Sequence, residues 1–272
     1  MNGLPASLVL VGAGKMGGAM LAGWQARGLS GTVNVLDPVP APEMVALCAR
    51  HGFGLNPPPL SLRPPEVLVL AIKPQMLEAA APALQALVGP GTLILSILAG
   101  KTLANVQARL PKARALVRAM PNTPAAVGRG ITGAFAGPGV SAVQKASAAA
   151  LLSAIGEVAW VGEETLIDAV TAVSGSGPAY VFYLTECLAK AGAALGLPPD
   201  LAARLARVTV EGSGELMHQD AATEPDVLRK NVTSPSGTTA AALDVLMADA
   251  GLQPLMTRAV AAAHRRAGEL SG

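Results

Sequence analysis

A glycine-rich segment near the start of the chain constrains the fold more than any other feature. The residues Gly12-Ala-Gly-Lys-Met-Gly17 follow an apolar run, Ser7–Val11, and lead into a helical pattern over Met16–Arg27. In a G-x-G-x-x-G motif between a strand and a helix, the first glycine permits a tight turn. The second lets the backbone approach a pyrophosphate, and the third lets the helix pack against the strand. The motif predicts a dinucleotide site formed by Gly12, Ala13, Gly14, Lys15, Met16 and Gly17; the alternative is a turn that serves close packing alone.

Apolar runs and helical patterns alternate over roughly the first 160 residues. Continuous apolar strands that alternate with helices are typical of a parallel sheet covered on both faces. The predicted strands are Ser7–Val11, Thr32–Leu36, Glu66–Ile72, Thr92–Ile97, Ala115–Ala119, Ile131–Ala136 and Val158–Val161. The predicted helices between them are Met16–Arg27, Pro42–His51, Gln75–Leu87, Leu103–Leu110 and Ser141–Ile155. The proline-rich stretch Asn56–Pro65 is predicted to be an extended loop.

After Gly162 the pattern changes, because helical patterns follow one another and no convincing strand appears. Several of them have proline near the first turn, where its missing N–H costs little. The predicted helices are Glu164–Val173, Pro178–Leu195, Pro199–Met217, Pro225–Asn231, Thr238–Ala250 and Gln253–Leu270. The fold class is therefore α/β: residues 1–162 as a Rossmann-like dinucleotide-binding domain, and residues 163–272 as an all-α domain.

The composition excludes several classes of function. Hydrophobic residues make up 51% of the chain and charged residues 14%, which argues against a disordered chain. A net charge of +2 and 3% aromatic residues argue against nucleic-acid binding. Cys48 and Cys187 form neither a disulfide framework nor a metal motif, and isolated histidines predict no metal site. Glycines and prolines interrupt the longest uncharged stretch, so we expect no membrane span and a cytoplasmic protein.

An acidic residue ends the second predicted strand. Asp37 lies 20 residues after Gly17, where a carboxylate usually accepts hydrogen bonds from the ribose hydroxyls of NAD and disfavours the 2′-phosphate of NADP. Taken alone, Asp37 therefore favours NADH. The alternative is a turn residue, since Asp37 precedes Pro38 and Asp-Pro is a common turn pair.

Two segments of small residues precede helices in the second half of the chain. These are SGSGPAY at residues 174–180 and TSPSGTT at residues 233–239. Each places backbone N–H groups and small hydroxyls at the start of a helix, an arrangement that suits a carboxylate. Ordinary helix capping by serine or threonine is the alternative for each segment. Together, beside a dinucleotide domain, they favour a small anionic substrate.

The chain resembles pyrroline-5-carboxylate reductases over nearly its whole length. The resemblance rests on GAGKMGGAM at 12–20, AIKPQ at 71–75, SILAG at 96–100, RAMPNTPAAVGRG at 118–130, DAVTAVSGSGPAYVF at 168–182 and NVTSPSGTTAAAL at 231–243. The resemblance implies a Rossmann domain followed by an all-α dimerisation and substrate domain. It also implies a homodimer through the helical domain or a larger ring of dimers, and reduction of 1-pyrroline-5-carboxylate to L-proline by NADPH or NADH.

The resemblance also implies roles for individual residues. Cofactor-binding positions are the glycine turn together with Asp37, Asn56, Ala71, Lys73, Pro74, Ala99, Met120, Asn122 and Glu164. Substrate-binding positions are Ser176, Gly177, Gly237, Thr238 and Thr239, and the catalytic candidates are Ser234 and Thr239. In this hypothesis the helix start over residues 236–239 holds the substrate carboxylate, and Thr239 holds the ring nitrogen or its proton. A protonated imine already accepts hydride well, so no strong general acid is required.

The chain departs from the family pattern at two places. The family loop more often reads SPGGTT, and here Ser236 replaces a glycine, which would cost strain if the position requires a positive φ. Asp37 stands where NADP-preferring members tend to carry small or basic groups. The sequence thus leaves the choice between NADPH and NADH open.

Two other functions compete with this interpretation. One is a different cyclic-imine or 2-oxo-acid reductase on the same scaffold, although the catalytic lysine motif of β-hydroxyacid dehydrogenases is not reproduced because Lys190 falls too far along. The other is a non-enzymatic nucleotide sensor, against which the intact TSPSGTT loop argues. Apolar helical stretches such as 189–195 and 240–250 exceed what a half of this size can cover, so we expect an obligate oligomer.

Overall fold

The protein is described by a computed structural model that covers residues 3–271. Within these residues the chain forms two compact units. One runs to Gly175 and also takes in the residues from Ala263 on, and the other is Ser176–Ala262. The first unit thus continues past the expected boundary between residues 162 and 163. The assignment of functions to residues 1–162 and 163–272 stays a prediction at this point.

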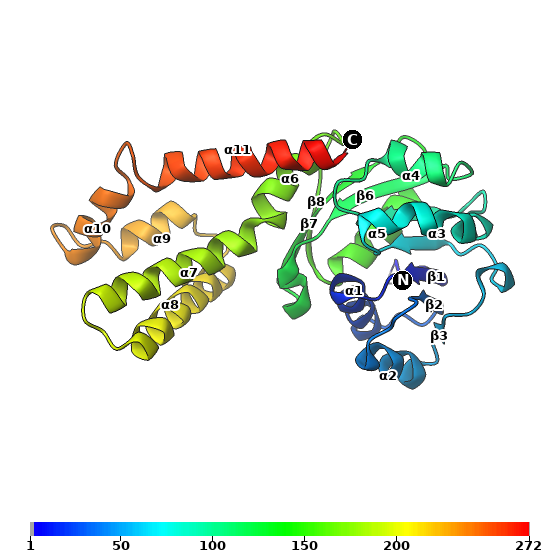
Figure 1. The fold of residues 1–272 in the computed structure, drawn as a ribbon, viewed down its shortest axis with the longest axis horizontal. Helices are drawn as coiled ribbons and strands as arrows, with labels where there is room; N and C mark the ends of the chain where they lie inside the picture. The colour runs from blue at the N-terminus through cyan, green and yellow to red at the C-terminus, as the bar shows by residue number, and fades with distance from the viewer. Residues whose placement is uncertain (1–2, 272) are drawn as a thin grey trace. The chain divides into compact units, whose positions relative to one another are not determined.

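The first unit is built on a mixed sheet that is parallel except at one pair of strands (Figure 1). Within the described residues eight strands follow the order β3-β2-β1-β4-β5-β6-β7-β8, and only β6 and β7 pair antiparallel. The first six strands have the order typical of dinucleotide-binding folds. The strands are β1 Ser7–Val11, β2 Thr32–Leu36, β3 Gly54–Leu55, β4 Val67–Leu70, β5 Leu93–Ser96, β6 Ala115–Met120, β7 Gly130–Ala136 and β8 Gly156–Trp160.

Helices connect these strands, and the predicted pattern of elements is confirmed with small changes. The expected helix over residues 75–87 is divided into a 3-10 turn, Pro74–Met76, the helix α3 and a second 3-10 turn, Gln85–Leu87. The proline-rich loop contains the 3-10 turn Pro59–Ser61. The helices of this unit are α1 Lys15–Ala26, α2 Pro42–His51, α3 Leu77–Leu84, α4 Leu103–Arg109, α5 Ala142–Ser153 and α6 Leu166–Val170.

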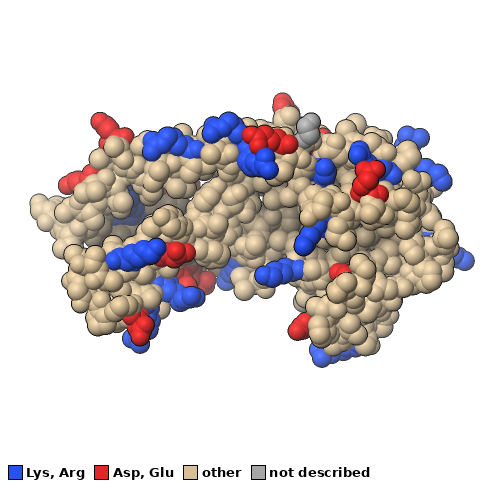
Figure 2. Space-filling model, viewed as in Figure 1, with Lys and Arg blue, Asp and Glu red and all other residues tan. Residues whose placement is uncertain are grey.

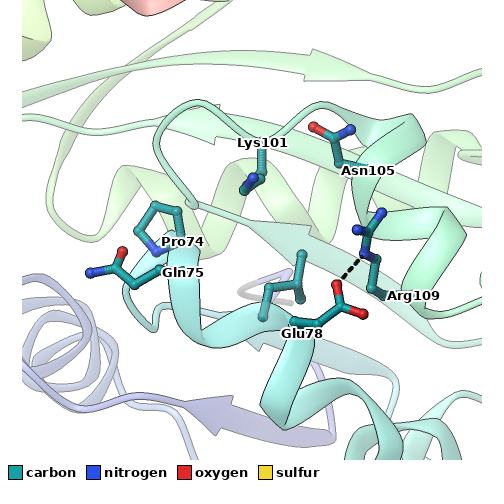
Figure 3. A pocket seen from close by; sticks show the side chains of 7 residues that line it. Pro74, Gln75, Glu78, Lys101, Asn105 and Arg109 are labelled. Carbon is teal, nitrogen blue, oxygen red and sulfur yellow. Dashed lines mark hydrogen bonds and ion pairs between the residues drawn. The ribbon is translucent and has the colours of Figure 1, made fainter. Parts of the chain in front are cut away.

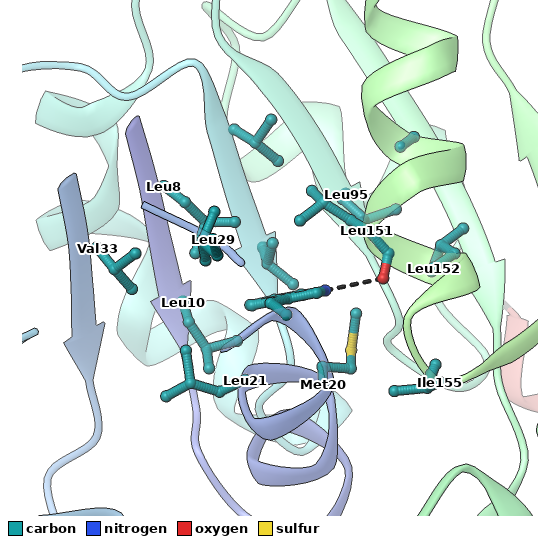
Figure 4. Packing of buried hydrophobic residues seen from close by; sticks show 14 of the residues in the cluster. Leu8, Leu10, Met20, Leu21, Leu29, Val33, Leu95, Leu151, Leu152 and Ile155 are labelled. Carbon is teal, nitrogen blue, oxygen red and sulfur yellow. Dashed lines mark hydrogen bonds between the residues drawn. The ribbon is translucent and has the colours of Figure 1, made fainter. Parts of the chain in front are cut away.

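Side chains of the central strand β1 point alternately to the two faces of the sheet, so the core has two layers. Leu8 and Leu10 of β1 pack with buried residues of α1, α2 and α5, whereas Val9 and Val11 pack with those of α3 and α4. This is why the strands are apolar on both faces. Trp24 of α1 is fully buried in the first layer, and its indole N–H donates to the carbonyl of Leu151 in α5 at 2.8 Å. Figure 4 shows Met20, Leu21 and Leu151 of the same layer.

The second unit consists of helices. They are α7 Gly177–Ala194, α8 Pro199–Gln219, α9 Pro225–Asn231, α10 Thr238–Leu246 and the first part of α11 Leu252–Ser271. α10 ends at Leu246, four residues before the predicted end at Ala250. Among the described residues of this unit, only Ala202 and Ala206 are buried hydrophobics. Within the described residues no helix has both the length and the apolar character needed to cross a bilayer.

Candidate functional site

The glycine turn between β1 and α1 has the geometry that its sequence predicts. Gly12 has φ +90°, and a Cβ there would lie 2.7 Å from the carbonyl oxygen of Ala71. A Cβ on Gly17 would collide with the carbonyl oxygen of Gly12. A Cβ on Gly14, in contrast, would meet no described atom within 4 Å. The first and third glycines therefore serve packing, and the second leaves open space beside the start of α1, at Lys15, where a phosphate group fits.

The carboxylate of Asp37 lies against this turn. One oxygen accepts the backbone N–H of Ala13 at 2.7 Å, and the other accepts that of Val39 at 2.9 Å. Asn56 pairs with the backbone of Asp37 by donating to its carbonyl at 2.7 Å and accepting from its N–H at 2.8 Å. Asn56 itself has φ 52°, a conformation that asparagine tolerates better than most residues. The structure therefore brings Ala13, Asp37 and Asn56 into one network at the ends of β1 and β2.

A cavity of about 470 Å³ adjoins Asp37. Its walls are mostly apolar, and among the described residues that line it Asp37 alone carries a charge. An aromatic ring beside a ribose would suit such a surface. The lining residues are Val11, Leu36, Asp37, Pro38, Asn56, Pro57, Pro58, Pro59, Ile72, Met76, Ala79, Ala80, Ala83 and Leu84.

The other predicted cofactor residues of the first unit follow the ends of β4, β5 and β6. Ligands bind at this carboxyl edge in doubly wound folds. Ala71 comes directly after β4, and Ala99 is an exposed residue after β5. Met120 ends β6, and the side-chain oxygen of Asn122 accepts the N–H of Ile131 at 2.9 Å. The positions that were predicted from separate motifs therefore share one edge, together with the exposed Lys73 and the adjoining Pro74.

A smaller pocket of about 120 Å³ lies between the start of α3 and α4 (Figure 3). Arg109 and Glu78 form an ion pair across it at 2.8 Å, with the Arg109 side chain 40% exposed and that of Glu78 76% exposed. Lys101 and Asn105 come from the loop after β5 and from α4. Of the predicted site residues only Pro74 is among the described residues that line this pocket, so the larger cavity is the better cofactor site.

Glu164 belongs to a partly buried cluster of charged side chains around Arg118. Arg118 lies in the middle of β6, is 3% exposed, and pairs with Asp168 at 2.8 Å and with Glu164 at 3.5 Å. The Glu164 carboxylate also accepts the backbone N–H of Leu103, the first residue of α4, at 2.7 Å. Its predicted contact with a cofactor stays a prediction, because the described contacts of this carboxylate are with the protein.

The predicted substrate loop, TSPSGTT at residues 233–239, lies in the second unit and leads into the start of α10. Ser236 has φ 58°, so the position where the family pattern more often has glycine does require a positive φ. The N–H of Gly237 donates to the carbonyl of Ser234 at 3.1 Å, which closes the turn. No side chain in the described part of the chain caps α10, whose first residues are Thr238 and Thr239. The first-turn N–H groups and these hydroxyls supply the donors that the predicted carboxylate site requires, and anion binding here stays a prediction.

The SGSGPAY segment is not the open helix start that we expected. α6 continues through a π-helical turn, Thr171–Gly175, and Ser176 alone separates this turn from α7. Ser176 has a helical conformation, with φ −86° and ψ −21°, and its carbonyl accepts the N–H of Ala179. Small residues allow the chain to continue from the π-helical turn into α7. A Cβ on Gly175 would lie 3.0 Å from the terminal methyl group of Met120. The substrate-binding roles of Ser176 and Gly177 stay predictions.

Sequence reasoning missed the Arg118 cluster and the π-helical turn. A charged residue within the apolar strand ALVRAM was a signal for the first, because a strand buried on both faces holds an arginine only if carboxylates pair with it. π-helical turns are frequent at functional sites, but the sequence showed only a helix followed by small residues. In the described part of the chain no group of three or more His, Cys, Asp or Glu side chains could hold a metal.

The strand order, the glycine turn with an open second glycine and the apolar cavity beside an acidic residue define a dinucleotide-binding oxidoreductase fold. Two family models match the chain: pyrroline-5-carboxylate reductase dimerisation over residues 164–270, and NADP oxidoreductase, coenzyme F420-dependent, over residues 7–100. The pyrroline-5-carboxylate reductase of Pseudomonas aeruginosa is 38% identical over 266 residues, 97% of this chain and 96% of that protein. The chain belongs to the pyrroline-5-carboxylate reductase family.

Solved structures agree with this assignment. A pyrroline-5-carboxylate reductase from Coxiella burnetii has a TM-score of 0.90 at 33% identity, with 98% of this chain and 99% of that chain covered. The pyrroline carboxylate reductase of Plasmodium falciparum, solved with NADP bound, has a TM-score of 0.78 at 25% identity, with 98% of each chain covered.

Proposed function

We propose that this chain reduces 1-pyrroline-5-carboxylate to L-proline with hydride from NAD(P)H, the final step of proline biosynthesis. Membership of the family supports the reaction, as do relatives that bear the enzyme's name over nearly the full chain. The observation that carries the proposal is the joint presence of an open Gly14 in a dinucleotide turn and an uncapped helix start at Thr238.

The nicotinamide cofactor, when bound, supplies the hydride. The backbone at Gly14 and Lys15 binds the pyrophosphate, because the first N–H groups of α1 have no partner within the helix and no side chain caps its start. The space beside Gly14 is open, since a Cβ there would meet no described atom within 4 Å. The mostly apolar cavity beside Asp37 holds the adenosine. From there the rest of the cofactor lies along the carboxyl edge of the sheet. The residues that line it are Ala71, Lys73, Pro74, Ala99, Met120 and Asn122.

The substrate loop binds and orients the cyclic imine. The N–H groups and hydroxyls over residues 236–239 bind the carboxylate, with Ser234 beside them and with Ser176 and Gly177 as further contacts. Thr239 holds the ring nitrogen or its proton. Hydride adds to the imine carbon while the nitrogen keeps its proton, so the C=N double bond becomes a C–N single bond. Since a protonated imine is a good hydride acceptor, the rate comes mainly from orientation.

Of the two nicotinamide cofactors, the proposed site favours NADH over NADPH. A 2′-phosphate would enter a cavity in which Asp37 is the one charge among the described lining residues, so the phosphate would meet repulsion without a compensating cation. The Asp37 oxygens have further lone pairs beyond those that accept from Ala13 and Val39, and these suit ribose hydroxyls.

The chain forms a homodimer through its helical unit, since the matching family model over residues 164–270 is a dimerisation domain. Large apolar side chains of this unit stay exposed in one protomer, and charged side chains on the face in Figure 2 are separated by broad uncharged areas. The dimers assemble into a larger ring, and the enzyme works in the cytoplasm.

A steady-state assay tests the function directly. Purified protein should oxidise NADH or NADPH when 1-pyrroline-5-carboxylate is added, and the product should be identified as L-proline. Turnover with a 2-oxo acid or another cyclic imine, in the absence of turnover with pyrroline-5-carboxylate, would favour the alternative reductase. Binding of cofactor without any turnover would favour a nucleotide sensor.

A further inference from the structure

The loop between β5 and α4 is held at several points around one exposed residue. Leu98 and Gly100 are buried, whereas Ala99 between them is exposed at the carboxyl edge of the sheet. The N–H of Leu103, where the loop enters α4, donates to the Glu164 carboxylate at 2.7 Å. The loop is thus anchored before and after Ala99 by groups that lie elsewhere in the chain.

The last turn of α11 lies directly on this loop. Gly100 has φ +68°, and a Cβ there would lie 2.8 Å from Cβ of Leu270 and 3.0 Å from its carbonyl oxygen. Both the backbone conformation and the close approach therefore require glycine at this position.

Ser271 ties the same turn to the Arg118 cluster. Its hydroxyl oxygen lies 3.2 Å from an Asp168 carboxylate oxygen and 3.0 Å from the carbonyl of Ala267, the two acceptors that share its one proton. The Arg118 guanidinium donates to that hydroxyl at 3.4 Å. Arg118 also pairs with Glu164, the residue that accepts from Leu103. A continuous set of polar contacts therefore runs from the end of α11 through Arg118 to the start of α4.

We propose that the end of α11, with Leu270 on Gly100 and Ser271 on the Arg118 cluster, is a positioning element for the dinucleotide. It fixes the loop after β5 so that Ala99 faces the cofactor. This inference rests on the proposed function for the identity of the ligand. It adds Gly100, Leu270, Ser271 and Arg118 as positioning residues that act through the loop without touching the substrate.

The experiment compares alanine variants of two glycines that have the same φ. Gly100→Ala places a methyl group against Leu270, whereas Gly52→Ala, also at φ +68°, places one where no described atom lies within 4 Å. The dissociation constant for NADH is measured by fluorescence titration, and the KM for pyrroline-5-carboxylate is measured at saturating NADH. Gly100→Ala should raise the dissociation constant at least about fivefold beyond Gly52→Ala and leave that KM within about twofold.

Two further variants keep the proposal testable if Gly100→Ala fails to fold. A chain shortened to end at Glu269 lacks Leu270 and Ser271 and should weaken NADH binding in the same way, and Ser271→Ala should weaken it to a smaller extent. In the shortened chain Gly100→Ala should have a smaller further effect, since its steric partner is absent.

An NADH dissociation constant that stays within twofold of wild type in the folded shortened chain would overturn the proposal. So would an equal effect of Gly100→Ala and Gly52→Ala. Lack of proline formation by wild type, with NADH binding intact, would overturn the proposed function and leave this comparison valid.

Discussion

At the scale of single residues, Asp37 has two tasks that involve the same carboxylate. It accepts the N–H of Ala13 and so stabilises the glycine turn, and it gives the adjoining cavity a negative charge. The first task is structural and should affect both cofactors alike, whereas the second should distinguish between them. A ratio of activities with the two cofactors separates these tasks.

We expect Asp37→Ser to shift cofactor preference towards NADPH. The substitution removes the charge that repels a 2′-phosphate, so the ratio of kcat/KM for NADH to that for NADPH should fall about tenfold or more, equivalent to ~1.4 kcal/mol. The ratio is unaffected by a general loss of stability. A wild-type enzyme that strongly prefers NADPH would contradict the role given to Asp37.

We expect Thr239→Ala to lower kcat about tenfold to a hundredfold, because a hydroxyl that positions the imine nitrogen contributes to orientation. The dissociation constant for NADH should not change. Thr257→Ala is a matched control, since Thr257 is an exposed threonine whose hydroxyl donates within α11 to Gln253. Unchanged reduction of pyrroline-5-carboxylate by Thr239→Ala would show that Thr239 has no such role.

At the scale of elements, Trp24 joins α1 to α5 and thereby supports the helix that follows the glycine turn. Its side chain is fully buried, and the indole N–H bonds to Leu151. Trp24→Ala should lower the free energy of unfolding by about 3–5 kcal/mol, measured by urea denaturation. Trp160→Ala, at a half-buried tryptophan of the edge strand β8, should cost clearly less.

If Trp24→Ala does not fold, Trp24→Phe retains most of the apolar contact and loses the hydrogen bond. It should cost about 1–3 kcal/mol, because the buried carbonyl of Leu151 loses its partner. Equal costs at Trp24 and Trp160 would argue against the packing role.

Elements of the first unit could be predicted because their patterns are local. A buried parallel strand such as Val67–Leu70 is apolar throughout, and the glycine turn has a spacing that few other structures require. β3, which has two residues, is too short to give a pattern. α10 ends at Leu246, before the predicted end at Ala250, because the chain turns back on the end of the helix. The approach is so close that a Cβ on Gly251 would collide with the carbonyl of Leu246.

The part of the site that depends on distant contacts could not be predicted. Arg118 meets Glu164, Asp168 and Ser271 at separations of 46, 50 and 153 residues, and no local pattern records such partners. The π-helical turn before Ser176 depends likewise on packing, since Gly133 and Gly175 admit Val170 and Met120. Motif spacing predicted the residues at the carboxyl edge of the sheet and at the start of α10. The Arg118 cluster and the π-helical turn depend on tertiary packing, so the sequence did not predict them.

At the scale of the whole molecule, dimer formation should determine the stability of the helical unit. Phe182 and Tyr183 of α7 are 64% and 63% exposed in one protomer. Phe182→Glu should convert the oligomer to a monomer, measured by sedimentation, because each buried phenylalanine contributes about 1.5–3 kcal/mol. The monomer should also have a lower melting temperature, measured by thermal denaturation. Val143→Glu, at an exposed residue of α5, is the control and should leave the oligomer intact.

The interleaving of the two units along the chain has a consequence for biosynthesis. The first unit takes in residues from both ends of the sequence, because the turns from Ala263 on pack with it. During translation the ribosome therefore releases most of the Rossmann-type sheet long before the segment that covers Gly100 and pairs with Asp168 is synthesised. Arg118 can pair with Asp168 and Glu164 as soon as these residues are synthesised, whereas its contact with Ser271 has to form last.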